Sequence, residues 1–190
     1  MLLRLHMKNF LHFIIISCIA TSCTKDRFQI DPFDKPSDTL SSDYKSLKIN
    51  EFCARGVSFV NEFGMASDWI EIYNTSNKNI LVKKGELFIT DDFGNKKDKY
   101  ALPNITIGPK EFILIWCDNR DTVKTQIHSN FSLSSNGESL GLVSKINGNI
   151  SDIDFYNYGV KLIDDQSEGR LPDGGPVWTV FSQATPGGPN

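Results

Sequence analysis

The stretch Asp68-Trp69-Ile70-Glu71-Ile72-Tyr73 decides the fold class of this chain, because its residues alternate in character by twos. Such alternation is typical of a β-strand with two different faces. Ile70 and Ile72 share one face, and Trp69, Glu71 and Tyr73 share the other. We therefore expect the isoleucines to face a core and Glu71 to lie between two aromatic residues on the opposite face.

Short apolar runs separated by turn residues continue from Leu47 onward, about every 8–12 residues, as in β-sandwiches and barrels. Further strands are predicted at Leu47–Phe52, Asn79–Val82, Leu87–Thr90, Phe112–Trp116, Ser139–Val143 and Ile150–Phe155. The run at 112–116 is apolar on both faces and should be a central strand. Hairpin turns are predicted at Asp92-Phe93-Gly94-Asn95 and Asn147-Gly148-Asn149. Only 120–127 looks helical, so the predicted fold is all-β.

The first 22 residues have the pattern of a secretory signal. Arg4 and Lys8 precede a short apolar run that ends in small residues before Cys23. The segment resembles the lipobox of bacterial lipoproteins, in which the cysteine is acylated, although Ala20 stands where leucine is usual. We expect lipid attachment at Cys23, with ordinary signal cleavage as the alternative, and both predict export. The lipid anchor further predicts a membrane-anchored protein of the cell envelope, on the periplasmic or the cell-surface side.

Residues 23–46 are polar and contain Pro32 and Pro36, which predicts a flexible tether. Residues 47–190 have the length and apolar content of one domain.

The whole chain has 20 basic and 23 acidic residues and a net charge of −3. These charges are interspersed and form no basic stripe, so nucleic acid is not expected as a partner.

Several blocks of the predicted domain together resemble the lamin tail domain family. They are Ile49–Phe52, Asp68–Asn74, Thr90–Asp92, Ile107–Pro109, Asn130–Ser134, Gly137–Leu140, Gly169–Gly174 and Thr185–Gly187. The resemblance implies an immunoglobulin-like β-sandwich that acts in binding or tethering. It also implies a structural signature formed by Trp69, Glu71, Asn74, Gly169, Arg170 and Pro172.

Catalytic chemistry has few candidate residues in this sequence. His6 and His12 lie in the predicted signal, so a histidine-dependent triad would need His128, for which we expect a structural or surface role. One histidine and two distant cysteines do not make a typical zinc site, and no phosphate-binding loop or nucleophile elbow is present. We expect no enzyme activity, no cofactor and no metal.

Three groups of residues leave alternatives open. The acids Asp91, Asp92, Asp98, Asp118, Asp121, Asp164 and Asp165 could bind calcium but fit solvated turns better. Cys53 and Cys117 are two buried thiols or a disulfide that closes a loop of roughly 60 residues. Trp69 and Trp116 fit core positions, whereas Trp178 could be partly exposed.

These observations predict a lipid-anchored, non-catalytic binding or tethering module of the cell envelope, with an envelope protein or polysaccharide as its partner. A carbohydrate-binding accessory protein is the alternative, and two exposed aromatic residues beside a groove would favour it. An undetected hydrolase would need a pocket that converges on His128 or on an acidic pair. We also expect an ion pair between Glu71 and Arg170 that ties the C-terminal segment to its sheet; the alternative is that both side chains are solvated.

Overall fold

The computed structural model describes residues 44–159 and 161–190. The predicted signal, Cys23 and most of the predicted tether lie outside the described residues. The last three tether residues, Tyr44–Ser46, form a 3-10 turn (η1), and Tyr44 is buried in the core. Its hydroxyl donates to a Glu86 carboxylate oxygen at 2.8 Å. Tyr44 is therefore part of the packed domain, three residues before the predicted boundary at Leu47.

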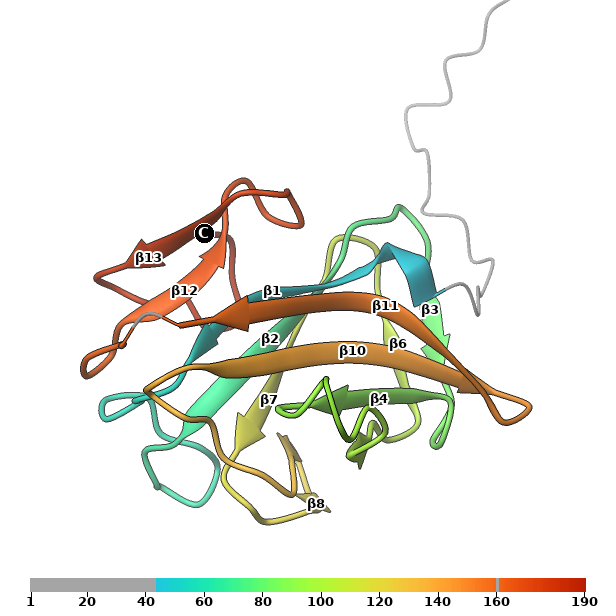
Figure 1. Cartoon of the computed structure of the whole chain (residues 1–190), viewed down its shortest axis with the longest axis horizontal. Coiled ribbons are helices and arrows are strands. Elements are labelled where there is room, and N and C mark those ends of the chain that lie inside the picture. Colours follow the sequence, from blue (N-terminus) through green and yellow to red (C-terminus); the bar gives the residue numbers. More distant parts are fainter. Residues whose placement is uncertain (1–43, 160) are drawn as a thin grey trace, which may run out of the picture. The chain divides into compact units, whose positions relative to one another are not determined.

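The described domain is an all-β sandwich, as the sequence predicted (Figure 1). Its larger sheet has the order β13-β12-β1-β2-β7-β9-β8. Its strands are β1 (Leu47–Cys53), β2 (Asp68–Asn74), β7 (Phe112–Cys117), β8 (Thr122–Val123), β9 (Ile127–His128), β12 (Ser167–Arg170) and β13 (Trp178–Phe181). All neighbours in this sheet are antiparallel except β7 and β9.

The second sheet has the order β11-β10-β4-β5, with β4 (Leu87–Thr90), β5 (Tyr100–Ala101), β10 (Glu138–Ile146) and β11 (Asn149–Tyr158). A small sheet pairs β3 (Ile80–Val82) with β6 (Ile105–Ile107). Figure 1 shows the long β10–β11 hairpin lying across β1 and β2. The hairpin turns at Asn147 and Gly148, whose φ angles of 52° and 82° are those favoured in two-residue loops.

The main core lies between the two large sheets. Ile70 and Ile72 of β2 and Ile115 of β7 belong to the same buried apolar cluster as Leu140 and Leu142 of β10. Their burial confirms the predicted inward face of β2. β7 lies inside its sheet, as its apolar sequence predicted.

The opposite face of the larger sheet carries a second, smaller apolar cluster. Trp69, Trp116, Cys53 and Ala184 are buried there, with Phe59 and Leu114 packed against them. Both tryptophans are therefore core residues, as expected. Because Ala184 belongs to this cluster, the C-terminal segment covers part of the outer face.

Two local predictions were incomplete. Residues 120–127 do not form a helix: they contain β8 and the first residue of β9. The turn at Asp92–Asn95 exists, because the amide of Lys96 donates to the Asp92 carbonyl at 2.8 Å, but it lies within a longer loop between β4 and β5. Within residues 44–159 and 161–190, no helix is long and apolar enough to cross a membrane.

Candidate functional site

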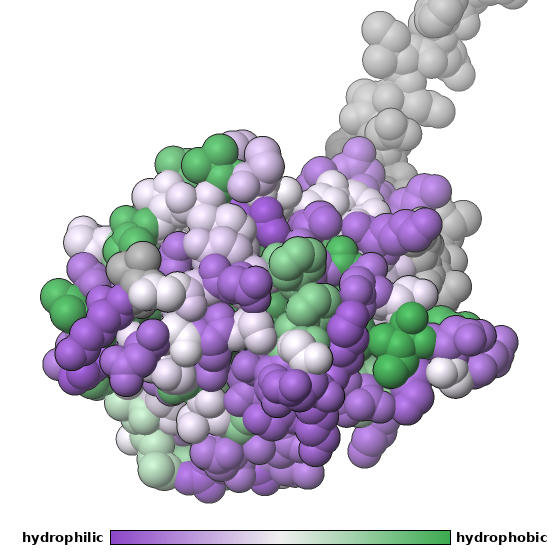
Figure 2. Space-filling model, in the orientation of Figure 1, coloured by the Kyte–Doolittle hydropathy of each residue, from purple (hydrophilic) through white to green (hydrophobic). Residues whose placement is uncertain are grey.

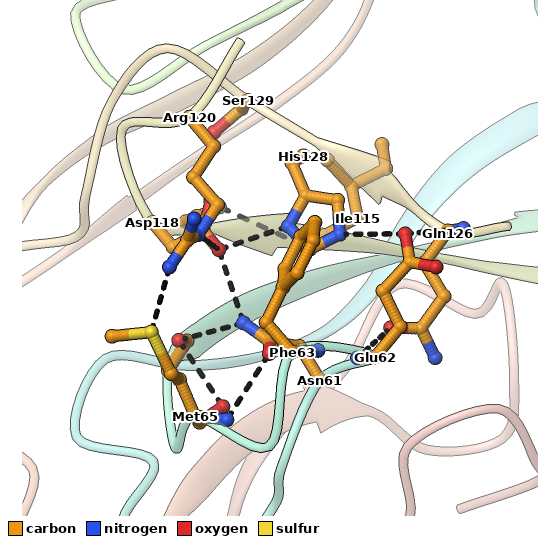
Figure 3. A network of polar contacts seen from close by, with 12 residues as sticks. Asn61, Glu62, Phe63, Met65, Ile115, Asp118, Arg120, Gln126, His128 and Ser129 are labelled. Atoms are coloured by element: carbon orange, nitrogen blue, oxygen red, sulfur yellow. Dashed lines mark hydrogen bonds and ion pairs between the residues drawn. The ribbon is translucent and has the colours of Figure 1, made fainter. Parts of the chain in front are cut away.

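His128 lies at the end of β9 with its side chain fully buried between two carboxylates (Figure 3). Its Nδ1 is 2.9 Å from Asp118 Oδ2, and its Nε2 is 3.3 Å from Glu62 Oε1. Asp118 follows β7 directly, whereas Glu62 comes from the long β1–β2 loop (residues 54–67). The parallel pairing of β9 with β7 places Trp116 beside His128 and brings Asp118 within reach.

Asp118 is held by further groups of the same loop region. The Asn61 side-chain amide donates to Asp118 Oδ2 at 3.1 Å, and Arg120 Nε lies 3.2 Å from the same oxygen. Asn61 also shapes its own loop, because its Oδ1 accepts from the backbone amides of Phe63 and Met65. Asn61 and His128 therefore join the β1–β2 loop to the end of β7.

Glu62 makes the second connection between the β1–β2 loop and β9. Its carboxylate accepts from the Thr125 hydroxyl and from the backbone amides of Thr125 and Gln126. In return, the Gln126 side-chain oxygen accepts from the Glu62 amide at 2.8 Å. Burial alone would raise the pKa of Glu62, but these hydrogen bonds and the one with His128 lower it to about 2. The carboxylate is therefore ionised at neutral pH.

This geometry leaves neither ring nitrogen of His128 free. Both ring nitrogens of His128 have carboxylate partners, and no hydroxyl or thiol among the described residues is hydrogen-bonded to them. The Ser129 hydroxyl donates instead to the Phe131 carbonyl at 3.1 Å. Proton transfer would require one of the buried carboxylate contacts to open first. We call Glu62, Asp118 and His128 the loop clamp, because together they fix the β1–β2 loop to the sheet.

The loop clamp supports an apolar surface. Val57, Val60, Phe63 and Met65 of the β1–β2 loop are all exposed, Val60 by 58%. The Arg120 guanidinium carbon lies 4.5 Å from the centroid of the Phe63 ring, and the His128 ring lies 5.1 Å away. Exposed apolar residues on one ordered loop mark a candidate contact surface. We call these four residues the loop surface.

A second polar cluster lies on the outer face of the larger sheet, where Glu51 and Glu71 are fully buried. Glu71 accepts from the Asn50 side-chain amide at 3.0 Å and from the Gly187 backbone amide at 2.7 Å. Glu51 accepts from Ser167 and from the amide and hydroxyl of Thr185. Burial raises the pKa of Glu71 to about 8, and it also raises that of Glu51.

The expected ion pair between Glu71 and Arg170 is wrong. Arg170 pairs with Asp154 of β11, with its Nη2 3.0 Å from both carboxylate oxygens. Its Nε donates to the Ile49 carbonyl at 2.8 Å, and its guanidinium carbon lies 4.7 Å from the Trp178 ring centroid. The solvated alternative is also wrong, because both side chains are buried. The C-terminal segment is tied to β2, but through the Gly187 amide.

The other signature residues have structural positions. Asn74 donates to the carbonyls of Lys78, Ile107 and Gly108, which joins the β2–β3 connection to the end of β6. Gly169 faces Glu51, and a Cβ there would lie 2.7 Å from Asn190 Nδ2 and 3.0 Å from Glu51 Cγ. Pro172 follows a cis peptide bond after β12. These positions fit a structural role.

The remaining predicted candidates are separated in space. Cys53 and Cys117 are free buried thiols in different apolar clusters, with β2 between their strands. Asp98 pairs with Lys145 at 2.8 Å, and Asp165 accepts from the amides of Val57 and Ser58. No group of three or more metal-binding side chains is found in the described part of the chain.

Sequence reasoning missed Glu62 and Asn61 as partners of this site. Glu62 lies 66 positions before His128, and no spacing rule connects the two. Asp118 is recognisable in the sequence only as an acid near a turn. No protein-family model matches the chain, and no curated protein is significantly similar to it.

Proposed function

We propose that this chain is an exported, lipid-anchored binding module of the cell envelope, related to the lamin tail domain, and that it has no catalytic activity. The observation that carries this proposal is the loop clamp. The loop clamp places carboxylates, and no hydroxyl or thiol nucleophile, at both ring nitrogens of His128, whereas the loop it fixes presents the exposed apolar loop surface. A rigid scaffold with ordered loops is the usual architecture of binding domains.

The membrane anchor is supported by sequence, because Cys23 follows a signal-like segment and precedes a polar tether. Acyl chains contribute about 0.8 kcal/mol per buried methylene, so several chains would hold the protein stably. The variant Cys23→Ser should leave the membrane fraction while still being exported. Cys18→Ser, which changes a cysteine within the predicted signal, is the matched control and should stay membrane-bound. If Cys23→Ser also stays in the membrane fraction, the anchor is wrong.

The binding role is tested with the Cys23→Ser chain and isolated, delipidated cell envelopes. Sedimentation of the mixture should show saturable binding. A Phe63→Ser and Met65→Ser double variant should weaken it, because it removes apolar area from the loop surface. The control is Ile146→Ser with Ile150→Ser, which removes exposed apolar residues at the far end of the β10–β11 hairpin. Absence of binding, or equal weakening by both double variants, would rule out the loop surface.

A carbohydrate-binding accessory role is the alternative, favoured by a stacked pair of aromatic rings on β11 and the β4–β5 loop, of which Phe155 is exposed and Phe93 is partly buried. Phe93 and Phe155 stack with centroids 5.0 Å apart, and Lys97 lies over the Phe93 ring at 4.4 Å. Figure 2 shows a hydrophobic patch among hydrophilic residues over the middle of β10 and β11. A hollow of about 460 Å³ nearby is lined by polar side chains that include Asn95 and Asp152.

This alternative predicts that a polysaccharide retards the native protein in an affinity gel. Phe155 is 54% exposed, and a sugar ring would stack on its free face. Phe155→Ala should abolish the retardation, whereas Phe63→Ala should not. The opposite result would favour the loop surface over the aromatic pair.

A further inference from the structure

The strand β13 forms one end of the larger sheet, and it lacks the usual protection of an edge strand. Its sequence Trp178-Thr179-Val180-Phe181 contains no charge and no proline, and Val177 before it is 57% exposed. Figure 2 shows hydrophobic residues on the side of the molecule where β13 lies. Exposed edges normally carry lysine, proline or a bulge, because an unpaired edge can bind another strand.

The other terminal strands of the two large sheets differ from β13. β8 and β5 have only two residues each. β11 is long, but it carries Asp152 and Asp154, and an Asp154 carboxylate oxygen accepts from the Ile49 amide of β1 at 3.0 Å. Short length and inward-pointing charges both protect an edge. Among these four strands, β13 is therefore the best suited to accept a partner.

The register of β13 shows which backbone groups are available. The amide of Leu171 donates to the Val177 carbonyl at 2.9 Å, so this pair is of the hydrogen-bonded kind. The pairs alternate along an antiparallel ladder, which makes Gly169 and Thr179 the next hydrogen-bonded pair. Trp178 and Val180 therefore direct their N–H and C=O groups away from β12, toward the open edge.

These free groups lie symmetrically about Thr179, so a second copy of the strand can pair with them in antiparallel orientation. With Thr179 opposite Thr179 of the second copy, Trp178 is opposite Val180 in both directions. Each of these pairs would exchange both of its N–H···O=C bonds. On the other face, Val177 would be opposite Phe181. Every resulting cross-strand pair is aromatic with β-branched, or threonine with threonine, and such pairs favour sheets.

We propose that β13 is a self-association edge, through which two copies of this chain form a symmetric dimer with one continuous sheet. The contact is isologous, because the same five residues, Val177 to Phe181, are used by both copies. Because this edge carries no charge and pairs with itself in register, a second copy of the chain fits it better than a charged partner does. The inference requires neither the lipid anchor nor the loop surface.

A single cysteine at the symmetry axis tests this geometry in cells that produce the full chain. The two Thr179 residues would form a non-hydrogen-bonded pair with Cα atoms about 4.5 Å apart, within the roughly 4.4–6.8 Å range of disulfides. Mild oxidation of Thr179→Cys should give a disulfide-linked dimer on a non-reducing gel. The unmodified chain, which contains the same native cysteines, sets the background.

Ser182→Cys is the matched control, because Ser182 is exposed and lies one residue beyond β13. In the proposed dimer the two copies of this position are about 20 Å apart along the strands. Cross-linking of Thr179→Cys should exceed that of Ser182→Cys by roughly tenfold, given the short reach of a disulfide. Equal cross-linking of the two variants, or none at Thr179→Cys above background, would overturn the proposal.

A proline at Val180 tests the backbone contact itself. Because the Val180 amide points outward, Val180→Pro removes a donor of the dimer without removing a bond to β12. Combined with Thr179→Cys it should abolish the disulfide-linked dimer, whereas Val180→Thr should preserve it. Chemical unfolding of each variant shows whether the domain remains folded. A folded Val180→Pro chain that still cross-links as strongly would contradict the proposal.

Discussion

Glu51 and Glu71 lie directly opposite each other on β1 and β2, and both side chains are fully buried. Neither carboxylate has an arginine or lysine partner within salt-bridge distance among the described residues. Hydrogen bonds from the C-terminal segment reach both carboxylates, from Thr185 to Glu51 and from Gly187 to Glu71. Two buried carboxylates side by side favour the protonated form of at least one, and Asp173 adds a further negative charge.

The stability of the domain should therefore fall as pH rises through neutrality. The pKa of Glu71 is raised from 4.5 to about 8, so the folded state binds a proton that the unfolded state releases in this window. The stability that the folded state gains by binding this proton is fully present below pH 4.5 and is lost as the pH rises through about 8. The upper bound of this gain in unfolding free energy is roughly 5 kcal/mol. Burial raises the pKa values of Glu51, Asp68 and Glu138 and acts in the same direction.

The check is urea unfolding of the native chain and of Glu71→Gln at several pH values between 5 and 9. The variant cannot ionise at this position, so its unfolding free energy should depend less on pH than that of the native chain. Identical slopes for the two proteins would contradict the assignment of the proton to Glu71.

The hydroxyl of Thr185 should contribute measurably to stability. Thr185→Val keeps the shape and the backbone amide but removes the hydroxyl that donates to Glu51 at 2.9 Å. A buried acceptor loses a donor, and we expect a cost of about 1–2 kcal/mol in chemical unfolding. Thr106→Val, at an exposed position of β6, is the matched control and should change stability by less than about 0.5 kcal/mol. Equal effects would show that the hydrogen bond contributes little.

Arg170 should be coupled to Asp154 and not to Glu71. Arg170→Met leaves the nearly buried Asp154 with Lys48 as its only cation, whose Nζ lies 3.8 Å from Asp154 Oδ1, so we expect a loss of up to about 3–5 kcal/mol. A double-mutant cycle of Arg170→Met with Asp154→Asn should be non-additive by about 1 kcal/mol or more. The cycle with Glu71→Gln should be close to additive. The reverse pattern would restore the original expectation of a Glu71–Arg170 pair.

His128→Ala should loosen the β1–β2 loop more than the rest of the domain. The variant removes the ring between Glu62 and Asp118, so local opening of residues 54–67 becomes easier. Chymotrypsin cleavage after Phe63 should become faster by about an order of magnitude, because proteolysis follows local opening. Val123→Ala, at an exposed position of β8, is the control and should leave the cleavage rate near that of the native chain. Unchanged cleavage in His128→Ala would mean that the other contacts hold the loop by themselves.

Local residue patterns were enough to predict the strands whose residues alternate and the turn whose residues accept positive φ. β2 and β7 were predicted from their apolar patterns, and the β10–β11 turn from Asn147 and Gly148. β12 and β13 were not predicted as strands. β12 buries the polar residues Ser167, Glu168 and Arg170, whose hydrogen-bond partners Glu51, Tyr156 and Asp154 lie on the other strands β1 and β11. Local hydrophobic patterns cannot reveal a buried strand of this kind.

The loop clamp illustrates the same limit for the candidate site. The sequence showed that His128 was the single histidine beyond the signal and predicted a structural role. Only the parallel pairing of β9 with β7 and the course of the β1–β2 loop placed Asp118 and Glu62 on its two nitrogens. These partners are tertiary, and one of them is 66 positions away.

The Glu71–Arg170 prediction failed because of the register of one strand. Glu71 was placed correctly on the outer face of β2, since alternation within a strand is a local property. The direction of Arg170 depends on how β12 pairs with β1, and Gly169 is the residue opposite Glu51. Directly paired residues share a face, so Gly169 shares the face of Glu51 and Glu71. Arg170, the next residue, therefore points to the inner face and meets Asp154, because successive side chains of a strand point to opposite sides of its sheet.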